Sequence, residues 1–178
     1  MARRNRTRYL DDGTPYRVCD CLEPALHISR EQWKQGMREA FALLSPQSRW
    51  QRFASGSASL TEAQLNYLTD VDGCSRGACC AVIPDPQRIR GIGIARYIRL
   101  DDDPQHAEFA VTVIDRYQGQ GVGRALMRHL VADARRNGID TLVGNVLPSN
   151  SGMLALCRTL GATISHEEEF VRVCLSIG

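Results

Sequence analysis

Apolar residues recur along this chain with two different periods. Short stretches in which apolar and polar residues alternate, or in which β-branched residues run together, are typical of β-strands. Such stretches predict strands over residues 16–21, 77–83, 90–100, 107–113, 141–146, 162–166 and 170–176. Between several of these strands, apolar residues recur at every third or fourth position, which is the period of an amphipathic helix.

This second period predicts four helices. Two of them begin at capping boxes, Ser29-x-x-Gln32 and Thr61-x-x-Gln64, whose side chains satisfy N–H groups of the first helical turn. The other two are expected over residues 122–138 and, capped by Ser149 or Asn150, over about 150–161. Strands and helices in this order predict an α/β domain with a mixed sheet flanked by helices.

The first helix is expected to end at Ser45-Pro46, because proline disfavours helical geometry in the residue before it. A linker would follow, carrying Trp50, Arg52 and Phe53. The apolar stripe of the helix consists of Trp33, Met37, Phe41 and Leu44.

Length and composition fit one globular domain. The chain has 178 residues, of which 43% are hydrophobic and 24% are charged. Residues 1–12 contain four arginines and end near Asp11-Asp12-Gly13. We expect them to form a flexible basic arm, followed by the domain over residues 13–178.

Charge and cysteine content argue against several functional classes. A net charge of +2 gives no basis for nucleic-acid binding, and no apolar run is long enough for a transmembrane helix or a signal peptide. The seven cysteines are odd in number and form no Cys-x-x-Cys motif, so we expect reduced thiols and no metal site. These features predict a cytoplasmic protein without membrane or nucleic-acid partners.

Residues 111–124 read as a strand, a sharp turn and a glycine-rich helix start. The free N–H groups of a helix start suit a pyrophosphate, and glycines let it approach the backbone. A dinucleotide fingerprint fails because Arg124 stands where the third glycine is needed, counting from Gly119, and a P-loop fails because no Lys-Ser/Thr follows. A glycine-rich turn without a ligand remains the alternative.

Two segments resemble motifs of the GNAT acyltransferase superfamily. Gln118-x-x-Gly121-x-Gly123 is similar to its acetyl-CoA signature, and residues 150–162 resemble its final helix motif. Over about residues 14–178, the resemblance implies a GNAT fold: a single twisted, mixed but mostly antiparallel sheet of about seven strands flanked by four helices. It also implies an N-acetyltransferase with acetyl-CoA as co-substrate and no metal.

The resemblance assigns a cofactor-binding role to residues of three segments. The strand backbone would bind the pantetheine arm, the glycine-rich turn would hold the pyrophosphate by its N–H groups, and the last helix would contribute an asparagine. The residues are Val111, Thr112, Val113, Gln118, Gly119, Gln120, Gly121, Val122, Gly123, Arg124 and Asn150.

Glu108 is the candidate catalytic base. A lysine amine with a pKa near 10.4 must lose a proton before it can attack a thioester, and a nearby base removes that proton. Glu108 lies in an otherwise apolar strand, where burial would raise its pKa toward the useful range. The alternative is a strand-edge carboxylate, or an ion pair with Arg96 or Arg99.

Cys157 occupies the position at which many GNAT enzymes have a tyrosine that protonates the departing thiolate. A cysteine could donate a proton, but a small buried helix residue is the interpretation that we favour. Water would then protonate the CoA thiolate, which is a good leaving group.

A further resemblance, to the bacterial Pat-type protein lysine acetyltransferases, rests on the segment Ser45-Pro46-x-Ser48-x-x-x-Arg52-Phe53 together with residues 107–111 and 142–150. It implies direct transfer of the acetyl group, in a ternary complex, to a lysine ε-amine on a protein, and it points to Glu108 as the base. We expect the enzyme to act as a monomer or a homodimer.

The acceptor would bind between Trp50, Arg52 and Phe53 on one side and the acidic run Glu167-Glu168-Glu169 on the other. An acidic rim attracts a cationic amine, although a charge run is commonly a solvated turn. Three other functions stay open. One is acetylation of a small-molecule amine, such as a polyamine, an amino sugar or an amino acid. The others are acetylation of protein α-amino groups and an inactive acyl-CoA-binding regulator.

Overall fold

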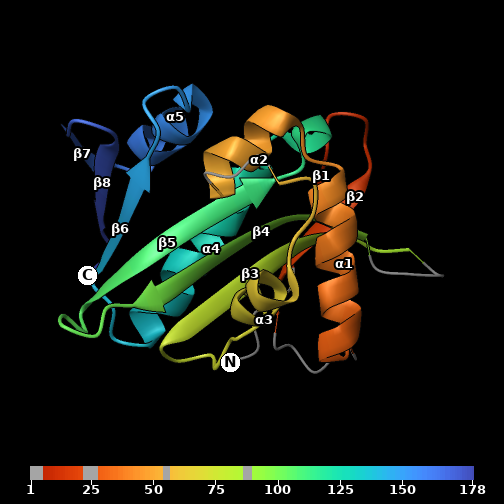
Figure 1. Ribbon diagram of the computed structural model, residues 1–178, viewed down its shortest axis with the longest axis horizontal. Coiled ribbons are helices and arrows are strands. Elements are labelled where there is room, and N and C mark those ends of the chain that lie inside the picture. The colour runs from red at the N-terminus through yellow and green to blue at the C-terminus, as the bar shows by residue number, and fades with distance from the viewer. Residues whose placement is uncertain (1–5, 22–27, 54–56, 86–89) are drawn as a thin grey trace.

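The computed structural model describes residues 6–21, 28–53, 57–85 and 90–178, and these contain one mixed sheet. Its eight strands lie in the order β1-β2-β3-β4-β5-β6-β8-β7 (Figure 1). Neighbouring strands are antiparallel except β5 and β6, which are parallel. The strands are β1 (Arg8–Tyr9), β2 (Pro15–Asp20), β3 (Arg76–Ile83), β4 (Arg90–Arg99), β5 (His106–Val113), β6 (Thr141–Val146), β7 (Thr163–His166) and β8 (Val171–Ser176).

Helices lie on both faces of the sheet. In Figure 1, α4 packs behind β3, β4 and β5, whereas α1 and α3 lie in front of them. This is the α/β architecture that the sequence predicted. Within the described ranges, no helix is long and apolar enough to span a membrane. The helices are α1 (Arg30–Ala42), α2 (Pro46–Phe53), α3 (Glu62–Leu68), α4 (Val122–Arg136) and α5 (Ser151–Thr159).

Helix α2 stands where the sequence analysis expected a linker, which is a correction. Pro46 is its first residue, and the Ser45 hydroxyl accepts a hydrogen bond from the Ser48 N–H (3.1 Å) as an N-cap does. Proline is favoured at a first helical position, where its missing N–H has no partner to lose. The same Ser-Pro pair therefore ends one helix and starts the next.

Part of the expected basic arm belongs to the domain. Arg8–Tyr9 pairs with the start of β2, and Leu10 is only 5% exposed in the core. The Asp11 N–H donates to the side-chain oxygen of Gln120 (3.1 Å), far along the chain. The arm was thus predicted too long at its C-terminal end, and residues 1–5 lie outside the described residues.

The two faces of the sheet are packed differently. On the α4 side the predicted stripe is buried against the sheet, with Leu126, Met127 and Leu130 at most 1% exposed. On the other side, Phe41 is the buried member of the α1 helix, and Trp33 and Met37 are half-buried. The α1 face is the less closely packed of the two, because a cavity lies beneath it.

Candidate active site

Strands β5 and β6 diverge after their first residues (Figure 1), and we call the region between their diverging backbones the wedge. Their parallel pairing covers three residue pairs at the start of each strand, whereas β5 stays paired with β4 as far as Val113. The Ile114 N–H donates to the Ile92 carbonyl on the β4 side (3.0 Å). Because successive residues of a strand direct their backbone groups to opposite sides, those of Val113 and Val111 face the wedge.

The turn after β5 presents backbone to solvent at the start of α4. A short 3₁₀ helix (Asp115–Tyr117) precedes Gly119 and Gly121, which have φ of +74° and +79° and are both exposed. Among the described residues, no side chain caps the first turn of α4, and the space beside both glycines is open. The N–H groups of Val122, Gly123 and their neighbours are therefore placed as an anion site requires.

The side chains of Gln118 and Gln120 brace this turn. Gln118 Nε2 donates to the Val113 carbonyl (3.0 Å), and Gln120 Nε2 donates to the Arg116 carbonyl (2.9 Å). Gln120 Oε1 accepts the hydrogen bond from Asp11 described above. Both side chains thus hold the protein backbone, and the main chain at Gly119 and Gly121 is left open to solvent.

Asp115 connects the turn to α2 and was missed by the sequence analysis. Its carboxylate accepts hydrogen bonds from the Ser45 N–H (2.9 Å), the Ser45 hydroxyl (2.6 Å) and the Ser48 hydroxyl (2.9 Å). Burial would raise the pKa of Asp115, but these hydrogen bonds outweigh it and lower the pKa. The Ser-Pro-x-Ser segment therefore joins two parts of the site. An aspartate two residues after the strand was the available sequence signal.

Glu108 is the last residue of β5 that pairs with β6, and its side chain is exposed. The expected burial among apolar neighbours is therefore wrong. Its sequence neighbours Ala107 and Phe109 are buried, but they lie on the other face of the strand. Apolar neighbours in the sequence therefore did not show that the Glu108 side chain is exposed. The carboxylate lies where the wedge begins, within reach of solvent.

The arginines considered as ion-pair partners of Glu108 bind elsewhere. Arg96 donates through both terminal nitrogens to the Tyr67 carbonyl (3.3 Å each). Arg99 donates to the carbonyls of Pro104 and Asn137. Arg96 thus contacts the end of α3, and Arg99 contacts the β4–β5 loop and the end of α4.

Asn150 and Cys157 lie at the start and in the middle of α5. Asn150 Oδ1 accepts from the Met153 N–H (3.0 Å) and caps the helix. Cys157 is 1% exposed, and burial raises the pKa of its thiol to about 11. Such a thiol is a poor proton donor and a poor nucleophile at neutral pH, which favours the packing interpretation.

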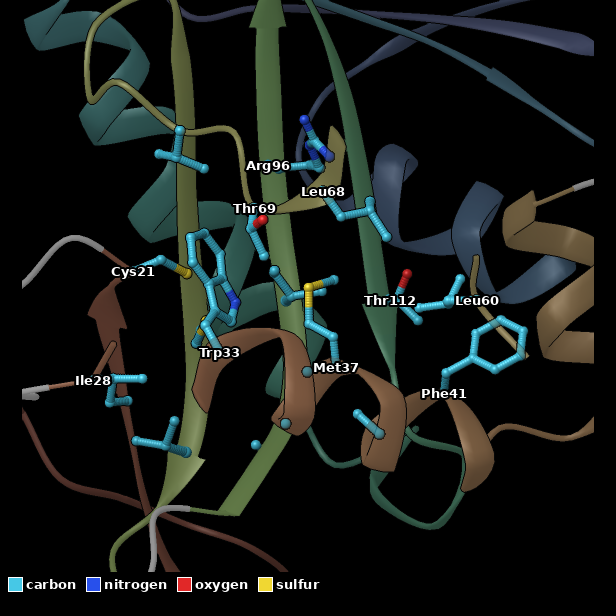
Figure 2. Close-up of a pocket in the computed structure, with 18 of the residues that line it drawn as sticks. Cys21, Ile28, Trp33, Met37, Phe41, Leu60, Leu68, Thr69, Arg96 and Thr112 are labelled. Atoms are coloured by element: carbon cyan, nitrogen blue, oxygen red, sulfur yellow. The ribbon is translucent and has the colours of Figure 1, made fainter. Parts of the chain in front are cut away.

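A cavity of about 650 Å³ separates α1 from β3, β4 and β5. Figure 2 shows apolar side chains of α1 on one side of it, opposite the sheet. The sequence analysis missed this cavity because an apolar helical stripe looks the same whether it faces a packed core or an empty space. The lining includes Trp33, Met37 and Phe41 from α1, Leu68 from α3, Arg96 from β4, and Ala110 and Thr112 from β5.

The predicted acceptor residues are only partly brought together. Arg52 and Phe53 line the cavity. Trp50 is 52% exposed and lies outside the lining. The acidic run 167–169 is in the turn between β7 and β8, strands at the far edge of the sheet from β1. Within the described residues, the cavity is thus bounded by α1, α2, α3 and the sheet rather than by the acidic turn.

Comparison with known proteins identifies a family. The sequence pattern of the Acetyltransferase (GNAT) family matches residues 41–162. An acetyltransferase of Pseudomonas aeruginosa is 36% identical over 132 residues, which cover 74% of this chain and 70% of that protein.

Two further relatives carry the Pat name. Acetyltransferase Pat of Mycolicibacterium smegmatis is 33% identical over 154 residues, or 83% of this chain, and the match spans 42% of that protein's length. The crystal structure of the GNAT domain of S. lividans PAT matches with a TM-score of 0.81 at 26% identity and covers 96% of both chains. The predicted fold is confirmed, and the part of the chain that the structure describes has eight strands in place of about seven and five helices in place of four.

Proposed function

Since this chain belongs to the acetyltransferase (GNAT) family, we propose that it transfers the acetyl group of acetyl-CoA to the ε-amine of a lysine on a protein. The observation that carries this proposal is the wedge between β5 and β6, which begins at the exposed carboxylate of Glu108. An exposed base can be reached by a lysine amine that belongs to a large protein substrate. The likeness to the two Pat relatives supports the lysine acceptor.

Acetyl-CoA would lie in the wedge. The backbone groups of Val111 and Val113 would bind the amides of the pantetheine arm much as an added strand does, with Thr112 between them. The Nδ2 group of Asn150 would bind the same arm while Oδ1 keeps its helix-capping bond. The pyrophosphate would lie against the N–H groups of Gln118, Gly119, Gln120, Gly121, Val122, Gly123 and Arg124.

Glu108 would act as the general base. A strand rises about 3.3 Å per residue, so the Cα atoms of Glu108 and Val111 are roughly 10 Å apart. The acceptor nitrogen fits between them and would give its proton to Glu108 directly or through one water. The nitrogen would then bond to the acetyl carbon, while the Val111 N–H stabilises the oxyanion. The C–S bond would break, the nitrogen would lose its second proton to water, and the departing CoA thiolate would take a proton from water.

The cavity under α1 favours a second candidate acceptor, a free small-molecule amine. Pockets of this size, largely apolar with a few polar groups, are typical of small-molecule sites. Thr112 and Ala110 line the cavity from the same face of β5 as Glu108. An amine held in the cavity would therefore approach the same base.

The state of the cysteines supports a cytoplasmic location. The seven cysteines are odd in number and form no Cys-x-x-Cys motif, and Cys79 and Cys80 are adjacent in the sequence, which favours reduced thiols. Neighbouring thiols persist where the surroundings are reducing. We therefore propose that the enzyme works in the cytoplasm.

An acceptor comparison tests the lysine proposal. The enzyme would be incubated with acetyl-CoA and either an N-terminally blocked lysine peptide, spermidine or a set of free amino acids. Released CoA thiol would be measured, and the product identified by mass spectrometry. Acetylation of the blocked peptide supports a protein lysine. Turnover of free amines alone would assign the enzyme to the small-molecule class.

A further inference from the structure

Two arginines face the cavity under α1, and within the described residues neither has a carboxylate at salt-bridge distance. Arg96 on β4 is 4% exposed, and its guanidinium lies over the Tyr67 ring at 4.6 Å. Arg52, near the end of α2, is half-buried and lies over the Phe53 ring at 4.9 Å. A guanidinium has five N–H donors, so these contacts leave donors on both side chains for a ligand.

The acidic groups nearby do not neutralise this pair. Asp70 also lines the cavity and its charge raises the pKa of Arg96, but its salt bridge is with Arg76. Burial and the neighbouring Arg96 lower the pKa of Arg52 to about 10, although Glu108 acts in the opposite direction. Arg52 therefore stays charged at neutral pH. Buried cations are costly unless an anion accompanies them.

The arginines and Glu108 share one face of the sheet. Arg96 stands directly opposite Ala110 across β4 and β5, and Glu108 is the next residue of β5 on that face. Diagonal neighbours of this kind are about 7–8 Å apart. A ligand whose amine lies at Glu108 would therefore bring a group only a few bonds away to the guanidinium groups.

We propose that the cavity binds an acceptor that carries a carboxylate close to its reacting amine, with the carboxylate held by Arg52 and Arg96. This proposal rests on acetyl transfer with Glu108 as the base. Arginine forms paired, bidentate hydrogen bonds with carboxylates, and an apolar surrounding strengthens them. The carboxylate could come from a free amino acid or from an aspartate or glutamate side chain beside the target lysine of a protein.

Matched acceptor pairs test the proposal and separate its two sources. One pair is a blocked lysine peptide with glutamate or with glutamine beside the lysine, and the other is a free amino acid and its carboxamide. The carboxylate member of at least one pair should have a kcat/KM about 10- to 100-fold higher, mainly through a lower KM. A preference in the peptide pair alone identifies a protein source, and one in the amino-acid pair alone identifies a small molecule.

Variants of Arg52 assign the preference to the cavity. Arg52→Gln should abolish the difference within the pair, and Arg52→Lys should restore part of it. Arg49→Gln is the matched control, because Arg49 is in the same helix, lies over the Phe41 ring at 4.9 Å and donates to the Ala42 and Ala58 carbonyls. It should leave the preference unchanged even if it lowers the melting temperature.

The outcomes distinguish this inference from the proposed function. Equal kcat/KM values within both pairs would overturn the carboxylate site and leave acetyl transfer intact. A preference that survives in Arg52→Gln would also overturn it. Failure to acetylate any amine would contradict the proposed function and, with it, this inference.

Discussion

Replacing Gly121 by alanine tests the cofactor site most directly. Gly121 has a φ of +79°, and an added Cβ would meet nothing within 4 Å, so the cost in the free protein is backbone strain. That strain amounts to about 1–2 kcal/mol for a residue with a side chain. Gly138, beyond the other end of α4, has a φ of +74° and equally open surroundings, so Gly138→Ala should cost the same. Both variants should melt roughly 2–8 °C lower.

Cofactor affinity should separate the two variants. The new Cβ of Gly121→Ala would hold the pyrophosphate away from the N–H groups at the start of α4. Losing one hydrogen bond to a charged group, worth about 1.5–3 kcal/mol, raises the Kd of CoA roughly 10- to 150-fold. Calorimetric titration of CoA into the parent protein and both variants, with melting curves on the same samples, measures both effects. If Gly121→Ala bound CoA as tightly as Gly138→Ala, the turn would not be the pyrophosphate site.

Three further substitutions test the chemistry and the link between helices. Glu108→Gln should lower kcat roughly 10²- to 10⁴-fold without changing CoA affinity, and parent-like turnover would exclude Glu108 as the base. Cys157→Ala should lower the melting temperature and leave turnover near the parent value, because the thiol packs in the core; an acetyl group found on Cys157 by mass spectrometry would instead identify a thiol nucleophile. The lowered pKa of Asp115 contributes stability that is fully present above its unfolded pKa near 3.8 and is lost as the pH falls through the lower folded value. Asp115→Asn should therefore flatten that part of the acid-unfolding curve, and an unchanged curve would contradict this role.

Local signals in the sequence predicted most of the elements. Both capping boxes form as expected, with Ser29 and Thr61 accepting from the N–H groups of Gln32 and Gln64. The apolar strands and the glycine-rich helix start also lie where they were predicted. These features depend on neighbours within a few residues, so the sequence alone carries the information.

Features that depend on distant contacts were missed. The two-residue strand β1 exists because β2 lies beside it, and its alternation is too short to recognise. The exposure of Glu108 depends on where β6 turns away from β5, and the cavity depends on how far α1 stands from the sheet. Periodicity tells which side chains share a face, but it does not tell what that face meets.

The hydrogen bonds of Asp115 also bear on how the two substrates influence each other. They fasten the N-terminal end of α2 to the turn that would hold the cofactor phosphates, and α2 carries Arg52 and Phe53 to the cavity that would hold the acceptor. A displacement of the turn by bound CoA would therefore be passed to the cavity through Ser45 and Ser48. By thermodynamic linkage, if bound CoA changes the affinity for the acceptor by some factor, bound acceptor changes the affinity for CoA by the same factor. Substrate synergy in this enzyme would then be measured as a coupling free energy, and Ser45→Ala should reduce it.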